Sequence, residues 1–308
     1  MPKRLVYSKH LSDKRCGVAY FAQMLAEKLS ARHVNGFHGF SQCDELYINM
    51  DIFELSEAEV RSLLNFIISQ NIKKTILLMH DYRFSYLEDE LIKHSQAVIN
   101  LSGEPSLKKK ADGKLIELFT PSVIEDPVLK FKKDRQKHFS LSFGFFNPRK
   151  KSFKSYLSFY EEMLKKQPDW SHIIIVSSHA GEDSDIRQNL TSFLEAKSIL
   201  VSDYMPNQLL SELISAADIG VFFYPTGIMQ NNMGPMAFFS QGKTVITTYG
   251  KLTPPAFKEF TVNFHQAGKF ILPDIRKIVS LGSRARTYYR KYLDWEIFIK
   301  KMTQFLEK

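Results

Sequence analysis

The chain has 308 residues, so we expect two domains of about 130–170 residues each, because single hydrophobic cores rarely grow beyond this range. Hydrophobic residues make up 44% of the sequence and aromatic residues 13%, which excludes an intrinsically disordered chain. Two cysteines, Cys16 and Cys43, exclude a disulfide framework, and the longest apolar runs, such as 216–224, are too short to span a bilayer.

The net charge of +9 limits the kinds of partner to expect. A basic surface attracts nucleic acid, anionic lipid or phosphorylated ligands. The sequence contains no zinc-ligand spacing and no aromatic–basic RNA-binding motif, so we do not expect nucleic acid as a partner. No signal peptide follows Met1, and few cysteines suit a reducing compartment. We therefore expect a cytoplasmic protein, with an anionic inner-membrane surface as one candidate partner.

Strand and helix patterns alternate through the first half of the chain. Phe21, Leu25 and Leu29 recur at helical spacing, and Ser56 with Glu59 is typical of a capping box at a helix start. The predicted strands are 4–7, 45–49, 74–79, 97–101 and 115–119, and the predicted helices are 18–31 and 56–71. The polar run 127–138 is the best linker candidate.

The second half repeats the alternation. The predicted strands are 139–145, 172–176, 199–201, 219–223 and 244–248, and the predicted helices are 152–166, 207–217 and 234–241. A last helix, 283–308, carries apolar anchors that include Trp295. Repeated alternation predicts two doubly wound parallel sheets that face each other, with ligands at the carboxyl ends of the strands. The expected domains are therefore 1–135, 136–282 and the terminal helix 283–308.

The segment 143–151 predicts an anion site. It runs from a strand through Asn147-Pro148 to three adjacent cations, Arg149, Lys150 and Lys151, where a helix is expected to begin. Backbone N–H groups and the positive end of a helix dipole bind phosphate, and adjacent cations add charge. The alternative interpretation is a solvated turn after a buried strand.

Ordered motifs along nearly the whole chain resemble the retaining glycosyltransferases of the GT-B fold, specifically family 4. The matching segments are the glycine loop 16–20 with its helix, the strand ending in His80-Asp81, the strand and lysine of 143–150, the helix 207–217, the donor-loop region 225–248 and the terminal helix with Trp295. The resemblance implies an N-terminal domain that binds acceptor, a C-terminal domain that binds donor, and a last helix that crosses back onto the N-terminal domain.

The resemblance also implies roles for individual residues. Lys150 would neutralise the diphosphate leaving group, with Arg149 or Lys151 as helpers, and Gly17 would allow close backbone approach to it. His80 would donate a hydrogen bond to the transferring sugar. The alternatives are an ordinary turn at Gly17 and a strand-end histidine bonded to a neighbouring carbonyl at His80.

The donor loop departs from the family pattern. Family members usually carry two glutamates eight positions apart, and Met229 and Ala237 stand at those positions here. Neither side chain accepts a hydrogen bond from a sugar or ribose hydroxyl. The groups that remain for donor binding are the side-chain amides and helix-start N–H groups of Gln230, Asn231, Asn232, Met233 and Gly234.

Sequence alone therefore predicts a metal-independent, retaining hexosyltransferase. It would use a nucleotide-diphosphate sugar as donor substrate, no further cofactor, and a glycan, lipid-linked or cell-surface acceptor. The alternative is a non-catalytic GT-B subunit that stabilises or targets a partner glycosyltransferase. The base, sugar, acceptor and linkage are not indicated by the sequence.

Overall fold

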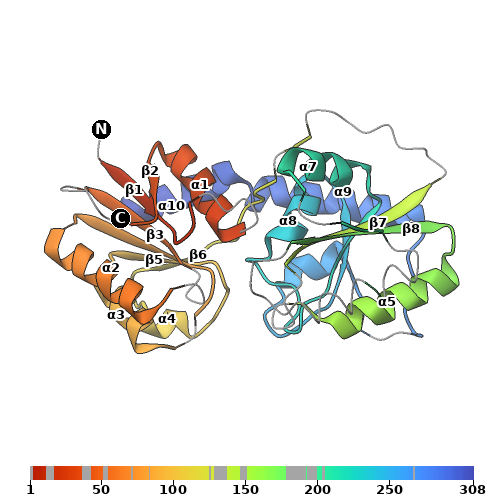
Figure 1. Ribbon diagram of the computed structural model, residues 1–308, viewed down its shortest axis with the longest axis horizontal. Helices are drawn as coiled ribbons and strands as arrows, with labels where there is room; N and C mark the ends of the chain where they lie inside the picture. Colours follow the sequence, from red (N-terminus) through yellow and green to blue (C-terminus); the bar gives the residue numbers. More distant parts are fainter. Residues whose placement is uncertain are drawn as a thin grey trace. The chain divides into compact units, whose positions relative to one another are not determined.

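The computed structural model describes residues 3–11, 17–36, 43–50, 55–70, 72–82, 84–124, 126–127, 137–145, 151–177, 192, 200–202, 205–265 and 268–308. The chain divides into two compact units, Met1–Val123 with Trp295–Lys308, and Ile124–Asp294 (Figure 1). The sequence pattern places these divisions after residues 135 and 282. The difference at the first division arises because residues around Ser122 are buried and bonded within the first unit.

The first unit is built on a six-stranded sheet in the order β2-β1-β3-β4-β5-β6, in which every neighbouring pair is parallel. Its strands are β1 (Arg4–Tyr7), β2 (Arg32–Val34), β3 (Glu45–Met50), β4 (Lys74–Met79), β5 (Ala97–Asn100) and β6 (Leu115–Glu117). Its helices are α1 (Gly17–Leu29), α2 (Glu57–Gln70), α3 (Tyr86–His94), α4 (Leu107–Lys110) and α10 (Trp295–Leu306).

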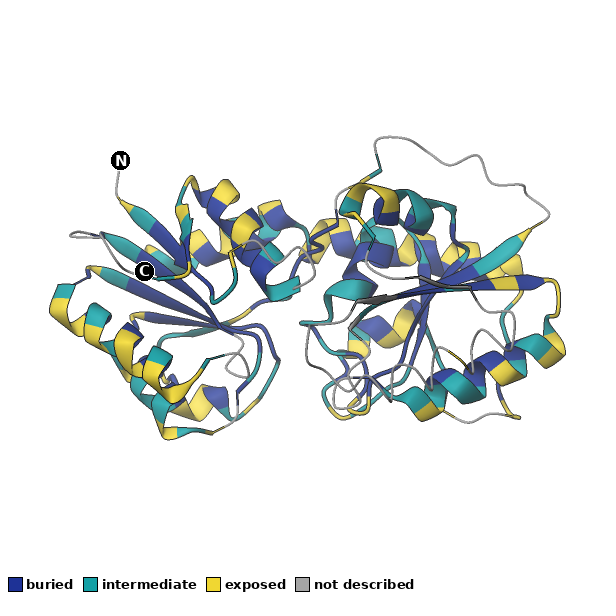
Figure 2. Ribbon diagram, viewed as in Figure 1, coloured by how far each residue is buried: buried dark blue, intermediate teal, exposed yellow. Residues whose placement is uncertain are grey.

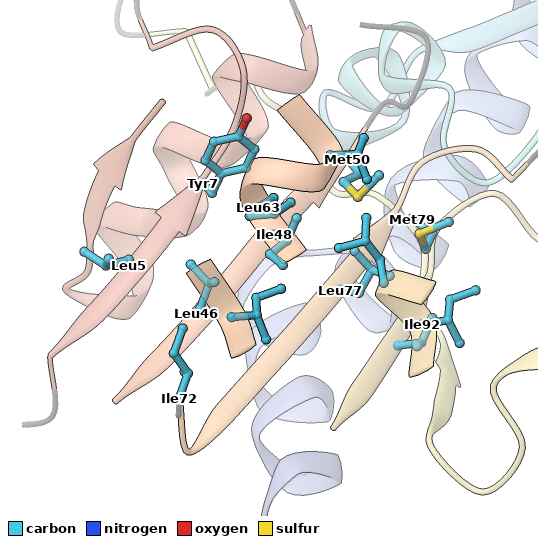
Figure 3. Packing of buried hydrophobic residues seen from close by; sticks show 14 of the residues in the cluster. Leu5, Tyr7, Leu46, Ile48, Met50, Leu63, Ile72, Leu77, Met79 and Ile92 are labelled. Atoms are coloured by element: carbon cyan, nitrogen blue, oxygen red, sulfur yellow. The ribbon is translucent and has the colours of Figure 1, made fainter. Parts of the chain in front are cut away.

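Helices cover both faces of this sheet, which explains why its central strands are almost wholly apolar. Alternate residues of β3 and β4, such as Ile48 and Leu77, pack with Leu63 of α2 and Ile92 of α3 in one hydrophobic cluster (Figure 3). The expected capping box at the start of α2 is confirmed, since Ser56 N donates to Glu59 at 2.6 Å and Glu59 N donates to Ser56 Oγ at 3.3 Å.

The expected terminal helix 283–308 is wrong in its bounds, because two helices occupy this region. The helix α9 (Ile275–Tyr292) belongs to the second unit, and α10 belongs to the first. Trp295 fixes α10 in the first unit. Its Nε1 donates to Ser122 O at 2.8 Å, and its ring stacks on Phe21 of α1 at 5.0 Å between centroids. The chain therefore returns to the first unit at residue 295.

The second unit also contains a six-stranded parallel sheet, in the order β12-β11-β10-β7-β8-β9. Its strands are β7 (His138–Phe145), β8 (Trp170–Ser177), β9 (Leu200–Ser202), β10 (Ile219–Phe222), β11 (Thr244–Thr247) and β12 (Thr261–Asn263). Its helices are α5 (Phe153–Lys166), α7 (Asn207–Ala216), α8 (Met233–Ser240), the short 3-10 helix η2 (Pro255–Glu259) and α9. Figure 2 shows buried residues concentrated in the strands and exposed residues on the outer sides of the helices.

The described helices include none that is long and apolar enough to cross a membrane. The described residues also include no group of three or more histidine, cysteine or acidic side chains arranged to hold a metal ion.

Candidate functional site

Lys151 is a buried cation of the second unit. It lies just before α5, with only 7% of its surface exposed. Its Nζ lies 4.4 Å from the ring centroid of Tyr224 and 4.8 Å from that of Phe222, and it donates to the Tyr224 hydroxyl at 3.5 Å. Among the described residues no carboxylate pairs with this amine. Arg149 and Lys150, the other cations of the predicted anion site, lie outside the described residues.

Burial of the Lys151 amine disfavours its charged form and lowers its pKa from 10.5 to about 7. A shift of this size corresponds to roughly 5 kcal/mol between the charged and neutral forms. The Tyr224 phenol does not supply a counter-charge, because burial raises its own pKa well above the usual value. The described residues therefore supply no negative charge to this site, and an anion bound beside Lys151 would favour the charged amine.

The Phe222 ring brings Lys151 close to the start of α8. A side-chain carbon added at Gly234 would lie 2.6 Å from this ring. Because Phe222 is fully buried, only glycine fits at position 234 in the first turn of α8. The Lys151 amine and the start of α8 therefore both approach the Phe222 ring. The first N–H groups of a helix have no intrahelical partner and attract anions. Two of the sequence-predicted positions, Lys151 and Gly234, are thus neighbours in space.

The loop before α8 has a defined shape. Asn232 accepts a hydrogen bond from Met229 N at 2.6 Å through Oδ1, and its own N–H donates to Met229 O at 3.2 Å. Gly227, at φ 82°, packs directly against the backbone of Gly250 after β11, where a side chain on either residue would overlap the other loop. Gln230 is buried. These contacts place the predicted donor-loop residues, Gln230 to Gly234, at the carboxyl end of β10.

In the first unit, His80 follows β4 directly and is 4% exposed. Its Nε2 lies 2.8 Å from Asn49 Oδ1, and the Asn49 amide nitrogen donates to Val18 O in α1 at 2.9 Å. Because a carbonyl only accepts, the Asn49 amide must donate to Val18, so Asn49 Oδ1 faces His80 and Nε2 carries a proton. The edge of the His80 ring also meets Phe21 at 5.1 Å. Nε2 of His80 therefore already donates a hydrogen bond within the protein, to Asn49 Oδ1.

A small pocket lies beside this network, at the carboxyl ends of β1 and β3. It is lined by Ser8, Lys9, His10, Val18, Ala19, Asn49 and Leu55. Gly17, the predicted close-approach glycine, is the first residue of α1 and adjoins the pocket through Val18. Gly17 and His80 are thus linked through Val18 and Asn49, whereas Lys14 and Arg15 of the preceding loop lie outside the described residues.

Sequence reasoning missed an aromatic segment that comprises the loop after His80 and the first residue of α3. Phe84 is 61% exposed and Tyr86 is 69% exposed, although both are large apolar side chains. Phe84 also has φ 66°, a left-handed conformation that costs a non-glycine residue about 1–2 kcal/mol. The Tyr82 ring, 4.7 Å away, supports Phe84, and Ser85 and Glu88 form a capping box behind it. Three aromatic residues within five positions of a strand end are the sequence signal for this loop.

Solved structures with the same arrangement of elements identify the fold. Sucrose-phosphate synthase from Thermosynechococcus elongatus superposes with a TM-score of 0.69 at 13% identity, covering 100% of this chain and 98% of that one. HepE from Anabaena, solved with UDP-glucose, gives 0.69 at 11% identity and 100% of both chains. WaaG, a glycosyltransferase involved in lipopolysaccharide biosynthesis, gives 0.63 at 10% identity, covering 97% and 98%. The chain has the GT-B fold. No family model and no curated protein matches the sequence.

In this GT-B chain, replacing Lys151 with methionine is expected to raise the free energy of unfolding at pH 7 by about 1–4 kcal/mol, because an apolar side chain of similar length carries no desolvation cost. Urea denaturation measures the change. Lys114→Met is the matched control. Lys114 Nζ donates to the carbonyls of Ile92 and Ser95, at 2.6 and 2.8 Å, so its loss is expected to destabilise the protein. A loss of stability in Lys151→Met would contradict a buried, uncompensated cation.

Proposed function

We propose that the protein is a retaining glycosyltransferase that moves a sugar from a nucleotide-diphosphate donor to a glycan, lipid-linked or cell-surface acceptor. The observation that carries the proposal is Lys151, a buried amine without a carboxylate partner among the described residues, beside the start of α8. Parallel α/β sheets bind ligands at the carboxyl ends of their strands, which is where this amine lies. HepE, of the same fold, binds UDP-glucose in its solved structure.

The proposed role of the second unit is to hold the leaving diphosphate. When the glycosidic bond to the nucleotide breaks, negative charge grows on the diphosphate, and fixed cations and N–H dipoles lower the barrier by stabilising that charge. Lys151 supplies a cation whose desolvation penalty is met when the protein folds and not when the diphosphate binds. The first N–H groups of α8 supply dipoles. Arg149 and Lys150 remain proposed helpers from the same turn.

The donor hydroxyls need other partners than the two glutamates usual in the family. Ala237 is fully buried in α8, so that position does not contact a ligand. The remaining polar groups are the side-chain amides of Gln230, Asn231 and Asn232, which donate and accept at once and therefore suit hydroxyl groups. We assign them to ribose and sugar binding.

The first unit is the proposed acceptor-binding part. Since Nε2–H of His80 already donates to Asn49, a hydrogen bond from His80 to the sugar would require protonated Nδ1 or release of Asn49. His80 and Asn49 are therefore assigned to shaping the pocket beside α1, and the departing phosphate is assigned to accept the acceptor proton, as the resemblance implies.

A non-catalytic GT-B subunit is the second candidate. The substitutions Met229 and Ala237 favour it, because they remove two hydrogen-bond acceptors from the donor loop. A subunit that only stabilises a partner has no need for a buried amine that lacks a carboxylate partner among the described residues, because such an amine lowers the stability of its own fold. The Lys151 environment therefore favours the enzyme.

The proposal predicts a stabilising response to nucleoside diphosphates. Thermal unfolding of the wild type is expected to shift upward with UDP, UDP-glucose or another nucleotide diphosphate at saturating concentration, and not with the free nucleosides. In Lys151→Met the shift is expected to disappear. Lys114→Met should keep it. The absence of any nucleotide response in the wild type would favour the non-catalytic subunit, and an unchanged response in Lys151→Met would remove this amine from the site.

Phe84 and Tyr86 are proposed to stack on the acceptor. Exposed aromatic faces bind the apolar faces of sugar rings, and a strained backbone that persists in a folded chain points to a functional constraint. The loop lies immediately after His80, at the edge of the first unit's sheet where ligands are expected.

The double variant Phe84→Ala, Tyr86→Ala is expected to lower binding to immobilised glycans on an array at least about fivefold, because each aromatic contact contributes roughly 0.5–1.5 kcal/mol. Hydrolysis of the nucleotide sugar by water, which needs no acceptor, should stay at the wild-type rate. Ile68→Ala, which removes an equally exposed side chain from α2, is the control. Equal glycan binding by the double variant and the wild type would contradict this role.

A further inference from the structure

The beginning of α9 exposes aliphatic side chains. Ile271 is 81% exposed, Ile275 is 37% exposed and Val279 is 64% exposed. Ile275 and Val279 are four residues apart and so lie on one face of the helix, and Ile271 lies in the non-helical segment that leads into α9. The adjoining face of α9, with Ile278, Leu281 and Ala285, is buried in the second unit. Nothing in the described fold requires apolar side chains on the outer face.

Cations surround these side chains. Lys269 and Arg276 are exposed beside them in the sequence, and Arg290 lies further along the same face of α9. The end of α5 adds two more, since Lys166 Nζ donates to Phe270 O at 3.0 Å and Lys165 precedes it.

Two acids lie nearby, and both accept hydrogen bonds within the fold. Glu162 pairs with Lys166 and accepts from Gly268 N, and the Asp274 side chain accepts from Lys277 N as the cap of α9. The five cations named above outnumber these two acids, so the surroundings carry a net positive charge.

We propose that this surface docks on an anionic lipid bilayer. The α9 patch comprises Lys269, Ile271, Ile275, Arg276, Val279 and Arg290. Aliphatic side chains on one side of a helix with flanking lysine and arginine are the composition of interfacial membrane-binding segments. The aliphatic chains enter the headgroup region, and the long cationic chains contact lipid phosphates. The assignment is independent of the proposed sugar transfer.

Charge and size both favour lipid over a protein partner. Stable protein interfaces bury at least about 1,000 Å² with a hydrophobic centre, and three separated aliphatic side chains do not provide such a centre. An anionic bilayer needs no shape complementarity, and each cation held near its surface strengthens binding roughly fivefold. The overall charge of +9 acts in the same direction.

Co-sedimentation of the full chain with vesicles tests the proposal. The probes are phosphatidylcholine vesicles with and without about 30% phosphatidylglycerol, at low salt and at about 500 mM NaCl. The wild type is expected to bind only the anionic vesicles, and high salt should release it. The charge-reversal variant Lys269→Glu, Arg276→Glu and the apolar variant Ile271→Glu, Val279→Glu are each expected to bind at least about tenfold more weakly.

Matched changes on the first unit serve as controls. Lys108→Glu, Lys109→Glu on α4 reverses two charges, and Ile68→Glu on α2 replaces an aliphatic side chain that is 59% exposed. Both controls are expected to bind like the wild type, and unchanged thermal midpoints would show that all variants fold. Wild-type protein that ignores anionic vesicles, patch variants that bind normally, or an equal loss in the controls would each overturn the proposal.

Discussion

The candidate chemistry depends on one electrostatic constraint, the burial of the Lys151 amine against two aromatic rings without a carboxylate partner among the described residues. Such a placement is costly, because the rings offset only part of the lost hydration. It persists because Phe222, Tyr224 and the start of α8 are fixed by the sheet and by close packing at Gly234. A chain under selection for stability alone would place an apolar side chain here. The cost is understandable when an anion occupies the site during function.

The parallel sheets explain why polar groups gather where they do. Every strand in each unit runs in the same direction, so the residues that follow the strands meet at one edge. In the first unit this edge holds Ser8 after β1 and His80 after β4, with Asn49 near the end of β3 between them. In the second it holds Tyr224 after β10 and Thr248 after β11. Thr248 Oγ1 accepts from Tyr224 N at 3.1 Å, which links the loop after β10 to the neighbouring strand end.

Much of the fold follows from local pattern in the sequence. Apolar runs such as 74–79 predict buried parallel strands, and the Ser56–Glu59 spacing predicts a helix start that the structure confirms. The strands β2 and β12 were not predicted, because each contains a single apolar residue among three, whereas the equally short β6 and β9 contain two. The break between α9 and α10 was missed because Leu293 and Trp295 are both buried and continue an apolar pattern across Asp294. Asp294 is itself a residue type favoured just before a helix, which was the available signal.

The site is harder to predict than the fold, since its properties come from contacts between distant residues. The basic turn was recognised as a feature, but Lys150 was taken as the central cation by resemblance, and it lies outside the described residues. The importance of Lys151 comes from Tyr224, 73 positions later, and from the Phe222 ring. Likewise, the hydrogen bond of His80 Nε2 is made to Asn49, which lies 31 positions earlier in the chain. Sequence patterns indicate which residue types are present, whereas burial and pairing decide their chemistry.

The most direct test is the pKa of the Lys151 ε-amine, measured by NMR on isotopically labelled protein, free and with UDP. An adjacent anion favours the charged amine and so raises its pKa. The account predicts a pKa of about 7 in the free protein and a clear upward shift when UDP binds. A pKa near 10.5 in the free protein, or a value that UDP leaves unchanged, would contradict it.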